Sequence, residues 1–221
     1  MIEVRQFSPQ TIKKAYNARS WIYSKTVAPR EHQNHLLAIE QANIQVGEKV
    51  LEVAVGPGLT FLDLAKKVGK GTRIYGIDIS SRMLQLTREK LQKEGLANFE
   101  LREADSRKLP FQDNTFDVLY NGYMLDLIPL DEMSQVLNEF KRVLKPGGRL
   151  VLLNMSKKDE ENNLQEKLYM TLPAAFVLYI FGACRPVLME KLVIETGFTE
   201  VSRTLLEAIN ASEIVTAEKQ T

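Results

Sequence analysis

Short apolar runs alternate with helical patterns along the middle of the chain, over residues 49–154. The first run, Val50-Leu51-Glu52-Val53-Ala54-Val55, ends at Gly56-Pro57-Gly58, which is typical of a buried strand that meets a tight turn. Apolar residues at helical spacing follow, and residues 73–77 form the second run. Repeated alternation of this kind predicts an α/β fold, with a mostly parallel sheet covered on both faces and a ligand site at the carboxyl ends of its strands.

The alternation continues toward the C-terminus. Ser80 is placed to cap one helix, and a helix from Asp131 is expected to end at Pro146-Gly147-Gly148. Three more strands are predicted at residues 98–104, 116–120 and 149–154. Two late runs, residues 199–206 and 212–217, are expected to close the sheet in antiparallel fashion.

Composition limits the partners. The 221 residues suit one domain, and 29 Lys and Arg against 28 Asp and Glu give a net charge of +1. No bulk attraction for nucleic acid follows from that balance, so partners must be recognised by a local site. One cysteine and two histidines predict neither an intrachain disulfide nor a metal site. A cytoplasmic setting is expected, because the first ten residues show no apolar leader or anchor.

We expect a single domain in four parts: a helical cap at 1–46, a core at 47–156, an apolar cap insertion at 157–190 and C-terminal strands at 191–221. The insertion contains an apolar stretch over residues 170–184, which is short for a bilayer span. That stretch is either an ordinary core helix, or an apolar lid or membrane-touching surface over the active site.

The glycine turn and the end of the second strand carry the first ligand signals. Gly56 and Gly58 let a ligand approach the backbone, and Asp78, twenty positions beyond Gly58, can accept hydrogen bonds from both hydroxyls of a ribose. A ligand-free turn and a helix-capping aspartate are the alternatives. Phe61 replaces the third glycine of a dinucleotide motif, and Pro57 lacks a backbone donor, so a phosphate-free nucleoside fits better.

Polar residues also end the next two predicted strands. Asp105 and Ser106 follow the third strand, and Asn121 lies at the end of the fourth. Together with the glycine turn and Asp78 they terminate four successive strands, which is the arrangement expected for an adenosyl ligand along the sheet edge.

These segments resemble the class I S-adenosylmethionine-dependent methyltransferases. The resemblance covers residues 49–154 and rests on segments 52–58, 76–80, 103–111, 116–118 and 142–148. Within the class the chain is similar to the ubiquinone/menaquinone C-methyltransferases and the small soluble phospholipid N-methyltransferases, partly because Ala54 stands where many relatives carry a glycine. The resemblance implies a Rossmann-like, doubly wound sheet of seven strands with an antiparallel final strand, an N-terminal helical layer and an apolar helical cap.

The resemblance also implies S-adenosyl-L-methionine as cofactor, with S-adenosyl-L-homocysteine as product. Glu52 would support the ammonium group of the cofactor, Asp78 the ribose, Asp105 the adenine amine, and Asn121 would lie near the methionine moiety. Tyr16 and Tyr23 either cover the cofactor or act only as packing anchors. The full cofactor-binding set is Tyr16, Tyr23, Glu52, Ala54, Gly56, Gly58, Asp78, Ile79, Met83, Asp105, Ser106 and Asn121.

The expected reaction is in-line methyl transfer that depends mainly on positioning. If the acceptor must lose a proton, the candidate bases are His35, Tyr123 and Asp126, each of which also has a purely structural interpretation. Arg185 either reaches an anionic headgroup or forms a structural ion pair.

The acceptor is expected to be lipophilic, an amino-phospholipid or a prenylated quinol, with transient contact to a membrane surface. The alternatives are methylation of a small soluble metabolite and a non-catalytic adenosyl-binding protein. A nicotinamide-dependent oxidoreductase is disfavoured by Pro57 and Phe61.

Overall fold

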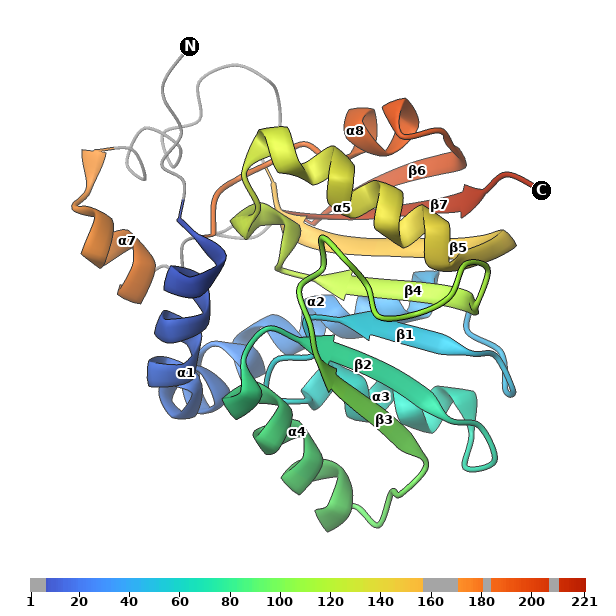
Figure 1. The fold of residues 1–221 in the computed structure, drawn as a ribbon, viewed down its shortest axis with the longest axis horizontal. Coiled ribbons are helices and arrows are strands. Elements are labelled where there is room, and N and C mark those ends of the chain that lie inside the picture. The colour runs from blue at the N-terminus through green and yellow to red at the C-terminus, as the bar shows by residue number, and fades with distance from the viewer. Residues whose placement is uncertain (1–6, 157–170, 181–183, 207–210) are drawn as a thin grey trace.

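A seven-stranded sheet forms the centre of the computed structural model, which describes residues 7–156, 171–180, 184–206 and 211–221 (Figure 1). The strand order is β3-β2-β1-β4-β5-β7-β6, with β7 antiparallel to both of its neighbours and the other pairs parallel. The α/β fold with an antiparallel final strand is thereby confirmed. The strands are β1 (Val50–Val53), β2 (Ile74–Asp78), β3 (Phe99–Glu103), β4 (Phe116–Gly122), β5 (Leu144–Met155), β6 (Phe198–Leu206) and β7 (Ser212–Lys219).

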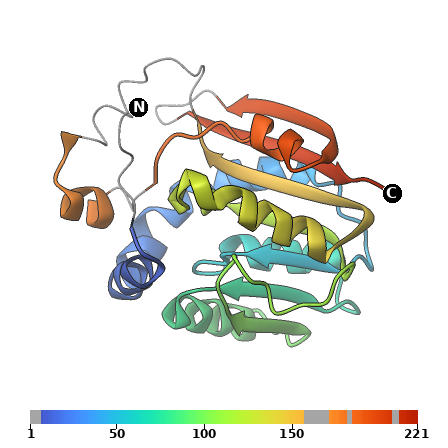
Figure 2. The same ribbon diagram turned by 45° about the horizontal axis from the view of Figure 1, so that its top comes forward.

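Helices cover both faces of the sheet (Figure 2). In β5, Leu150 and Leu152 pack on the side of α5 and α8, whereas Val151 and Leu153 pack on the side of α2, α3 and α4. Alternate side chains thus enter two cores, which explains why the strand sequence is apolar throughout. The helices are α1 (Pro9–Thr26), α2 (Ala28–Gln41), α3 (Leu59–Val68), α4 (Ser81–Lys93), the 3₁₀ helix η1 (Leu125–Leu127), α5 (Leu130–Val143), α7 (Ala174–Ile180) and α8 (Glu190–Glu195).

Two predicted boundaries differ from the observed ones. The first strand ends at Val53 rather than at residue 55, because Ala54 adopts a positive φ of 64° that leaves the extended conformation. Helix α5 ends at Val143 and β5 begins at once, so Pro146-Gly147-Gly148 lies inside the strand rather than before it. Pairing of Leu144 with Phe116 across an irregular register extends the ladder past these residues.

The predicted N-terminal helical layer is present as α1 and α2, and α7 packs against α1. Ile12, Ala15 and Leu178 form a small apolar cluster between the two helices, and Arg19 donates to the carbonyl of Leu178 at 3.0 Å. Only part of the predicted apolar stretch is seen, because residues 157–170 and 181–183 lie outside the described residues. Among the described helices, none is long and apolar enough to cross a membrane.

Candidate active site

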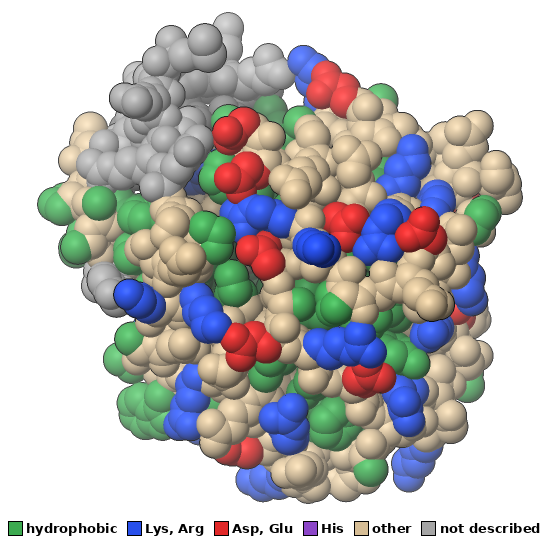
Figure 3. All heavy atoms as spheres, viewed as in Figure 1, with side chains coloured by type: hydrophobic (Ala, Val, Ile, Leu, Met, Phe, Trp, Pro, Cys, Tyr) green, Lys and Arg blue, Asp and Glu red, His purple; other side chains and the backbone are tan. Residues whose placement is uncertain are grey.

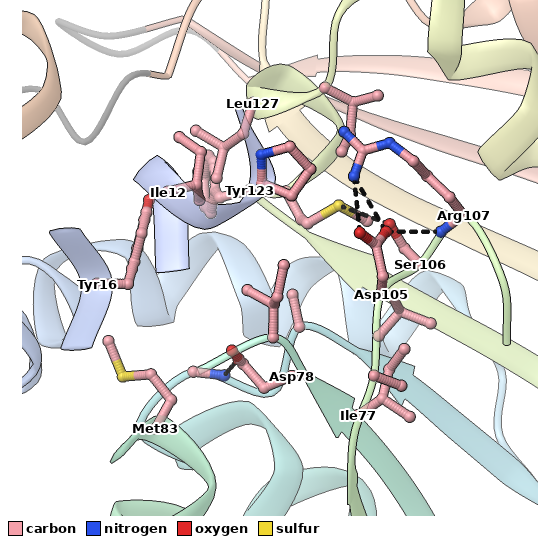
Figure 4. A pocket seen from close by; sticks show the side chains of 18 of the residues that line it. Ile12, Tyr16, Ile77, Asp78, Met83, Asp105, Ser106, Arg107, Tyr123 and Leu127 are labelled. Carbon is pink, nitrogen blue, oxygen red and sulfur yellow. Dashed lines mark hydrogen bonds and ion pairs between the residues drawn. The ribbon is translucent and has the colours of Figure 1, made fainter. Parts of the chain in front are cut away.

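A cavity of about 810 Å³, open mouth included, lies at the carboxyl ends of β1, β2, β3 and β4. Figure 4 shows Ile12 and Tyr16 of α1 on one side and the strand ends that carry Asp78 and Asp105 on the other. Ten of the residues singled out from the sequence line it: Tyr16, Tyr23, Ala54, Gly56, Asp78, Ile79, Met83, Asp105, Ser106 and Tyr123.

The glycine turn after β1 is shaped by two constraints. Gly56 and Gly58 have φ values of 53° and 76°, which side chains rarely adopt. A Cβ on Gly58 would lie 2.8 Å from the backbone of Thr87, whose hydroxyl donates to the carbonyl of Gly56 at 2.8 Å. Gly58 therefore allows α4 to approach the turn, whereas Gly56 lines the cavity itself.

Asp78 is held at the end of β2 by backbone donors. Its two carboxylate oxygens accept from the N–H groups of Gly56 at 2.9 Å and Ser80 at 2.8 Å. Burial raises the pKa of Asp78 to about 6, and these hydrogen bonds oppose the rise. Each carboxylate oxygen keeps a second lone pair for a ligand donor.

Glu52 and Asn121 lie behind the cavity wall and are not among its lining residues. The amide nitrogen of Asn121 donates to the carbonyl of Val53 at 2.8 Å, while its Oδ1 and Oε2 of Glu52 have no hydrogen-bond partner among the described residues. Burial, and then the charges of Asp78 and Asp63, raise the pKa of Glu52 well above its usual value. Two buried acceptors without donors are an unusual cost, which a ligand or a water molecule offsets.

Asp105 is oriented by a residue that the sequence analysis missed. Arg107 donates from Nη1 to both carboxylate oxygens of Asp105, at 2.9 and 3.1 Å, and its Nε pairs with Glu132. Arg107 also lines the cavity, and its place two positions after Asp105 was the available signal. The other lining residues not singled out are Phe7, Pro9, Ile12, Val53, Ile77, Ala104, Gly122, Met124, Leu127 and Ile128.

Helix α1 brings the two tyrosines to the cavity. The rings of Tyr16 and Tyr23 meet edge to face with centroids 5.9 Å apart, and the Tyr23 hydroxyl donates to Glu31 at 2.8 Å. Burial raises the pKa of Glu31 to about 7. The helix is fastened to α4 by a 2.6 Å hydrogen bond from the Ser80 hydroxyl to the side chain of Asn17. Neither Glu31 nor Asn17 stood out in the sequence.

The three candidate bases occupy different surroundings. Tyr123 lines the cavity, but its hydroxyl is engaged by Asn34 at 2.9 Å and Ser212 at 3.0 Å, and burial raises its pKa to about 12. His35 does not line the cavity; its Nδ1 lies 2.8 Å from the Tyr120 hydroxyl, and burial lowers its pKa to about 3. His35 is therefore neutral near pH 7.

Asp126 is fully buried directly behind the cavity residues Leu127 and Ile128. Its Oδ2 accepts from the Met155 N–H at 3.4 Å, and burial raises its pKa to about 7 while the charge of Arg185 opposes the rise. Arg185 is itself buried and donates to the carbonyl of Ile128. Arg185 is not among the cavity-lining residues, and its two interpretations stay predictions.

The cavity thus combines two chemical surfaces. Its strand-end side presents carboxylates and a glycine turn to a ligand rich in donors, and its α1 side presents mostly apolar groups. Among the described residues, no cluster of His, Cys, Asp and Glu is arranged to hold a metal ion.

Comparisons with known proteins agree with this site. Residues 50–148 match the model of a family described as a methyltransferase domain. The demethylmenaquinone methyltransferase of Geobacillus stearothermophilus is 33% identical over 158 residues, covering 70% of this chain and 67% of that protein. The chain spans about half the length of several other demethylmenaquinone methyltransferases that it matches.

Solved structures with low sequence identity share the fold. The [4+2]-cyclase SpnF superposes with a TM-score of 0.79 at 17% identity, over 100% of this chain and 98% of that chain. A SAM-dependent methyltransferase from Aquifex aeolicus superposes with a TM-score of 0.64 at 23% identity, over 97% of this chain and 100% of that one. With the family match, the curated relatives and the strand-end cavity in agreement, this chain belongs to the S-adenosylmethionine-dependent methyltransferases.

Proposed function

We propose that this protein transfers a methyl group from S-adenosylmethionine to a lipophilic acceptor of the amino-phospholipid or prenylated quinol class. The observation that carries the proposal is that acidic strand ends and an apolar surface from α1 and residues 124–128 line one cavity. Relatives named demethylmenaquinone methyltransferases support a quinol-like acceptor.

The residues present fit the cofactor. Unpartnered oxygens of Glu52 and Asn121 lie behind the glycine turn, where they suit a cationic or N–H-bearing group. When bound, S-adenosylmethionine supplies an activated methyl group and S-adenosylhomocysteine is its product. Burial and the charge of Asp78 disfavour the carboxylate form of Glu52, and a positively charged ligand group beside it would favour that form.

The nucleoside part of the cofactor is recognised at the ends of β2 and β3. Asp78 is preorganised by two backbone donors, so it accepts ribose hydroxyls without reorganising. Ile79 and Met83 supply an apolar surface for the adenine ring. Asp105, which Arg107 holds in place, accepts from the exocyclic amine of the adenine.

The chain's own contribution to the reaction is positioning and exclusion of water. Helix α1 covers the cavity with Ile12, Tyr16 and Tyr23, so the acceptor is held in a largely apolar space. For an acceptor that must lose a proton, the pKa of Asp126, about 7, suits a general base, but its side chain is buried behind the cavity lining. The pKa values of His35 and Tyr123 lie far below and far above that range.

A second candidate function is an adenosyl-binding protein that does not transfer methyl groups. This alternative is favoured by the positions of the candidate bases. His35 and Asp126 do not line the cavity, and the Tyr123 hydroxyl is already hydrogen-bonded to Asn34 and Ser212. The fold does not decide the reaction, because a protein titled a [4+2]-cyclase shares it.

Two measurements test the proposal. Calorimetry should show S-adenosylhomocysteine binding to the full chain. Asp78→Ala should weaken the affinity by about tenfold or more, which corresponds to the loss of about one charge-assisted hydrogen bond. Transfer of labelled methyl groups should then be detected with lipid or quinol acceptors. Transfer only to small soluble metabolites, or cofactor binding without transfer to any acceptor, would replace the proposal with one of its alternatives.

A further inference from the structure

The outer face of α1 carries an exposed stripe that the cavity does not use. Its members are spaced at four, seven, eight and eleven positions from the first, so they lie on one side of the helix. All are exposed, with Trp21 at 65% and Ile22 at 58%. The stripe, called here the α1 stripe, consists of Lys14, Ala18, Trp21, Ile22 and Lys25.

The neighbouring helix α7 also exposes apolar side chains. Ala174, Ala175 and Phe176 are exposed on α7, whereas Val177 and Leu178 are buried. Both views of the ribbon place α7 beside α1, away from the sheet (Figures 1 and 2). Hydrophobic side chains gather along that edge of the molecule in Figure 3. Large exposed apolar groups in such a grouping mark an interaction surface.

The positive charge of α1 and the residues beside it indicates an anionic partner. Between Phe7 and Arg30 the sequence contains five basic residues and no acidic residue, although the whole chain is nearly neutral. In the stripe, Lys14 and Lys25 flank the apolar pair Trp21 and Ile22 on the same face. Lysines beside an exposed tryptophan are the pattern of a helix that lies in the interface of an anionic bilayer, with the ammonium groups at the headgroups and the ring at their level.

We propose that the α1 stripe and the exposed face of α7 dock on an anionic lipid surface. The opposite face of α1, through Ile12, Tyr16 and Tyr23, lines the cavity. One helix diameter, about 10 Å, therefore separates the docked membrane from the cavity. A lipophilic acceptor reaches the cavity from the bilayer around this helix without crossing bulk water. The assignment of a lipophilic acceptor rests on the proposed function, but the lipid surface itself is tested separately.

The chain offers a direct reporter, because Trp21 is its single tryptophan. The emission of the full-length protein is recorded with vesicles of phosphatidylcholine alone and of phosphatidylcholine with phosphatidylglycerol. A blue shift with the anionic vesicles, reversed by high salt, together with co-sedimentation, is the expected result. An emission spectrum that neither vesicle changes would overturn the proposal.

Variants locate the surface. Ile22→Ser, and Lys14→Glu combined with Lys25→Glu, should each reduce vesicle binding, the latter by about tenfold or more. Matched controls are Ile194→Ser on α8, which is 54% exposed, and Lys66→Glu with Lys67→Glu on the exposed side of α3. Controls that lose as much binding as the stripe variants would contradict the assignment. The surface would be assigned to a second copy of the chain by two results obtained without vesicles. These are a blue shift that grows with protein concentration and a doubled mass in sedimentation.

Two further outcomes separate this inference from the proposed function. Asp78→Ala should bind vesicles as the unaltered protein does while losing methyl transfer. Transfer to a detergent-dispersed acceptor without vesicle binding would leave the methyltransferase standing and remove the docking surface. Vesicle binding without transfer to any acceptor would support the docking surface and remove the proposed methyl transfer.

Discussion

The hydroxyl of Ser80 donates to Oδ1 of Asn17 at 2.6 Å, so the residue that caps α4 also fastens α1 across the cavity. The same hydroxyl oxygen accepts from the N–H of Met83 at 3.1 Å and satisfies the first turn of α4. One side chain thereby links the nucleoside end of the cavity to the helix that covers it.

Removing this link should weaken cofactor binding without unfolding the chain. Asn17→Ala leaves the cap of α4 intact but frees α1, and the loss of one hydrogen bond, about 1 kcal/mol, predicts a rise of roughly fivefold in the Kd for S-adenosylhomocysteine. Calorimetry measures the Kd, and Asn138→Ala is the control because the amide of Asn138 donates to the Ser134 carbonyl within α5. Equal affinities of Asn17→Ala and the unaltered protein would show that α1 needs no such fastening.

The ionisation of Asp126 should make the folded state less stable as pH rises. Its folded pKa of about 7 lies above its usual value of 3.8, so the folded state binds the proton more tightly than the unfolded chain between pH 4 and 7. The stabilising contribution is complete below pH 4 and is lost as pH increases toward 7, by as much as about 4 kcal/mol. Urea unfolding at pH 5 and pH 7.5 measures this change.

Asp126→Asn is the variant that isolates the effect. It should flatten the part of the pH dependence that lies between pH 4 and 7, and, if Asp126 is the base, remove a limb near pH 7 from the pH profile of kcat/KM. Asp131→Asn, which changes an exposed acid at the start of α5, is the control for stability. An unchanged stability slope in Asp126→Asn would contradict the raised pKa, and an unchanged kcat/KM profile would exclude Asp126 as the base.

Gly58 should tolerate no side chain. Gly58→Ala must adopt a positive φ of 76° and place a Cβ 2.8 Å from the Cα of Thr87, a backbone atom that cannot move without shifting α4. We expect a loss of about 1–3 kcal/mol in the free energy of unfolding. Gly71→Ala is the control, because no atom lies within 4 Å of the Cβ it would add. Chemical denaturation that shows equal stability for both variants would refute this account of the turn.

Much of the site was predictable because its signals are local. Gly56 comes shortly after β1, Asp78 is the last residue of β2, and the carboxyl ends of parallel strands meet at one edge. What could not be predicted depends on contacts between distant segments. Asn17 and Ser80 are 63 positions apart, and Glu132, whose carboxylate pairs with Arg107, lies 25 positions beyond it. For Arg185 the sequence leaves an anion-binding group and a structural ion-pair partner as alternatives, and only the fold shows that it is buried and bonded to the carbonyl of Ile128.

His35 illustrates the same limit and gives the last prediction. Its ring packs against Gly122, where a Cβ would lie 2.4 Å from Cε1, and bonds to Tyr120. Because burial lowers its pKa to about 3, the unfolded chain binds the proton more tightly, so stability is complete above pH 6.5 and falls as pH decreases toward 3. His35→Gln should weaken this acid sensitivity yet retain methyl transfer at pH 7.5. His32→Gln, at the partly exposed pair with Asp63, is the matched control. Loss of transfer in His35→Gln, with cofactor affinity and unfolding at pH 7.5 unchanged, would instead make His35 a participant in the reaction.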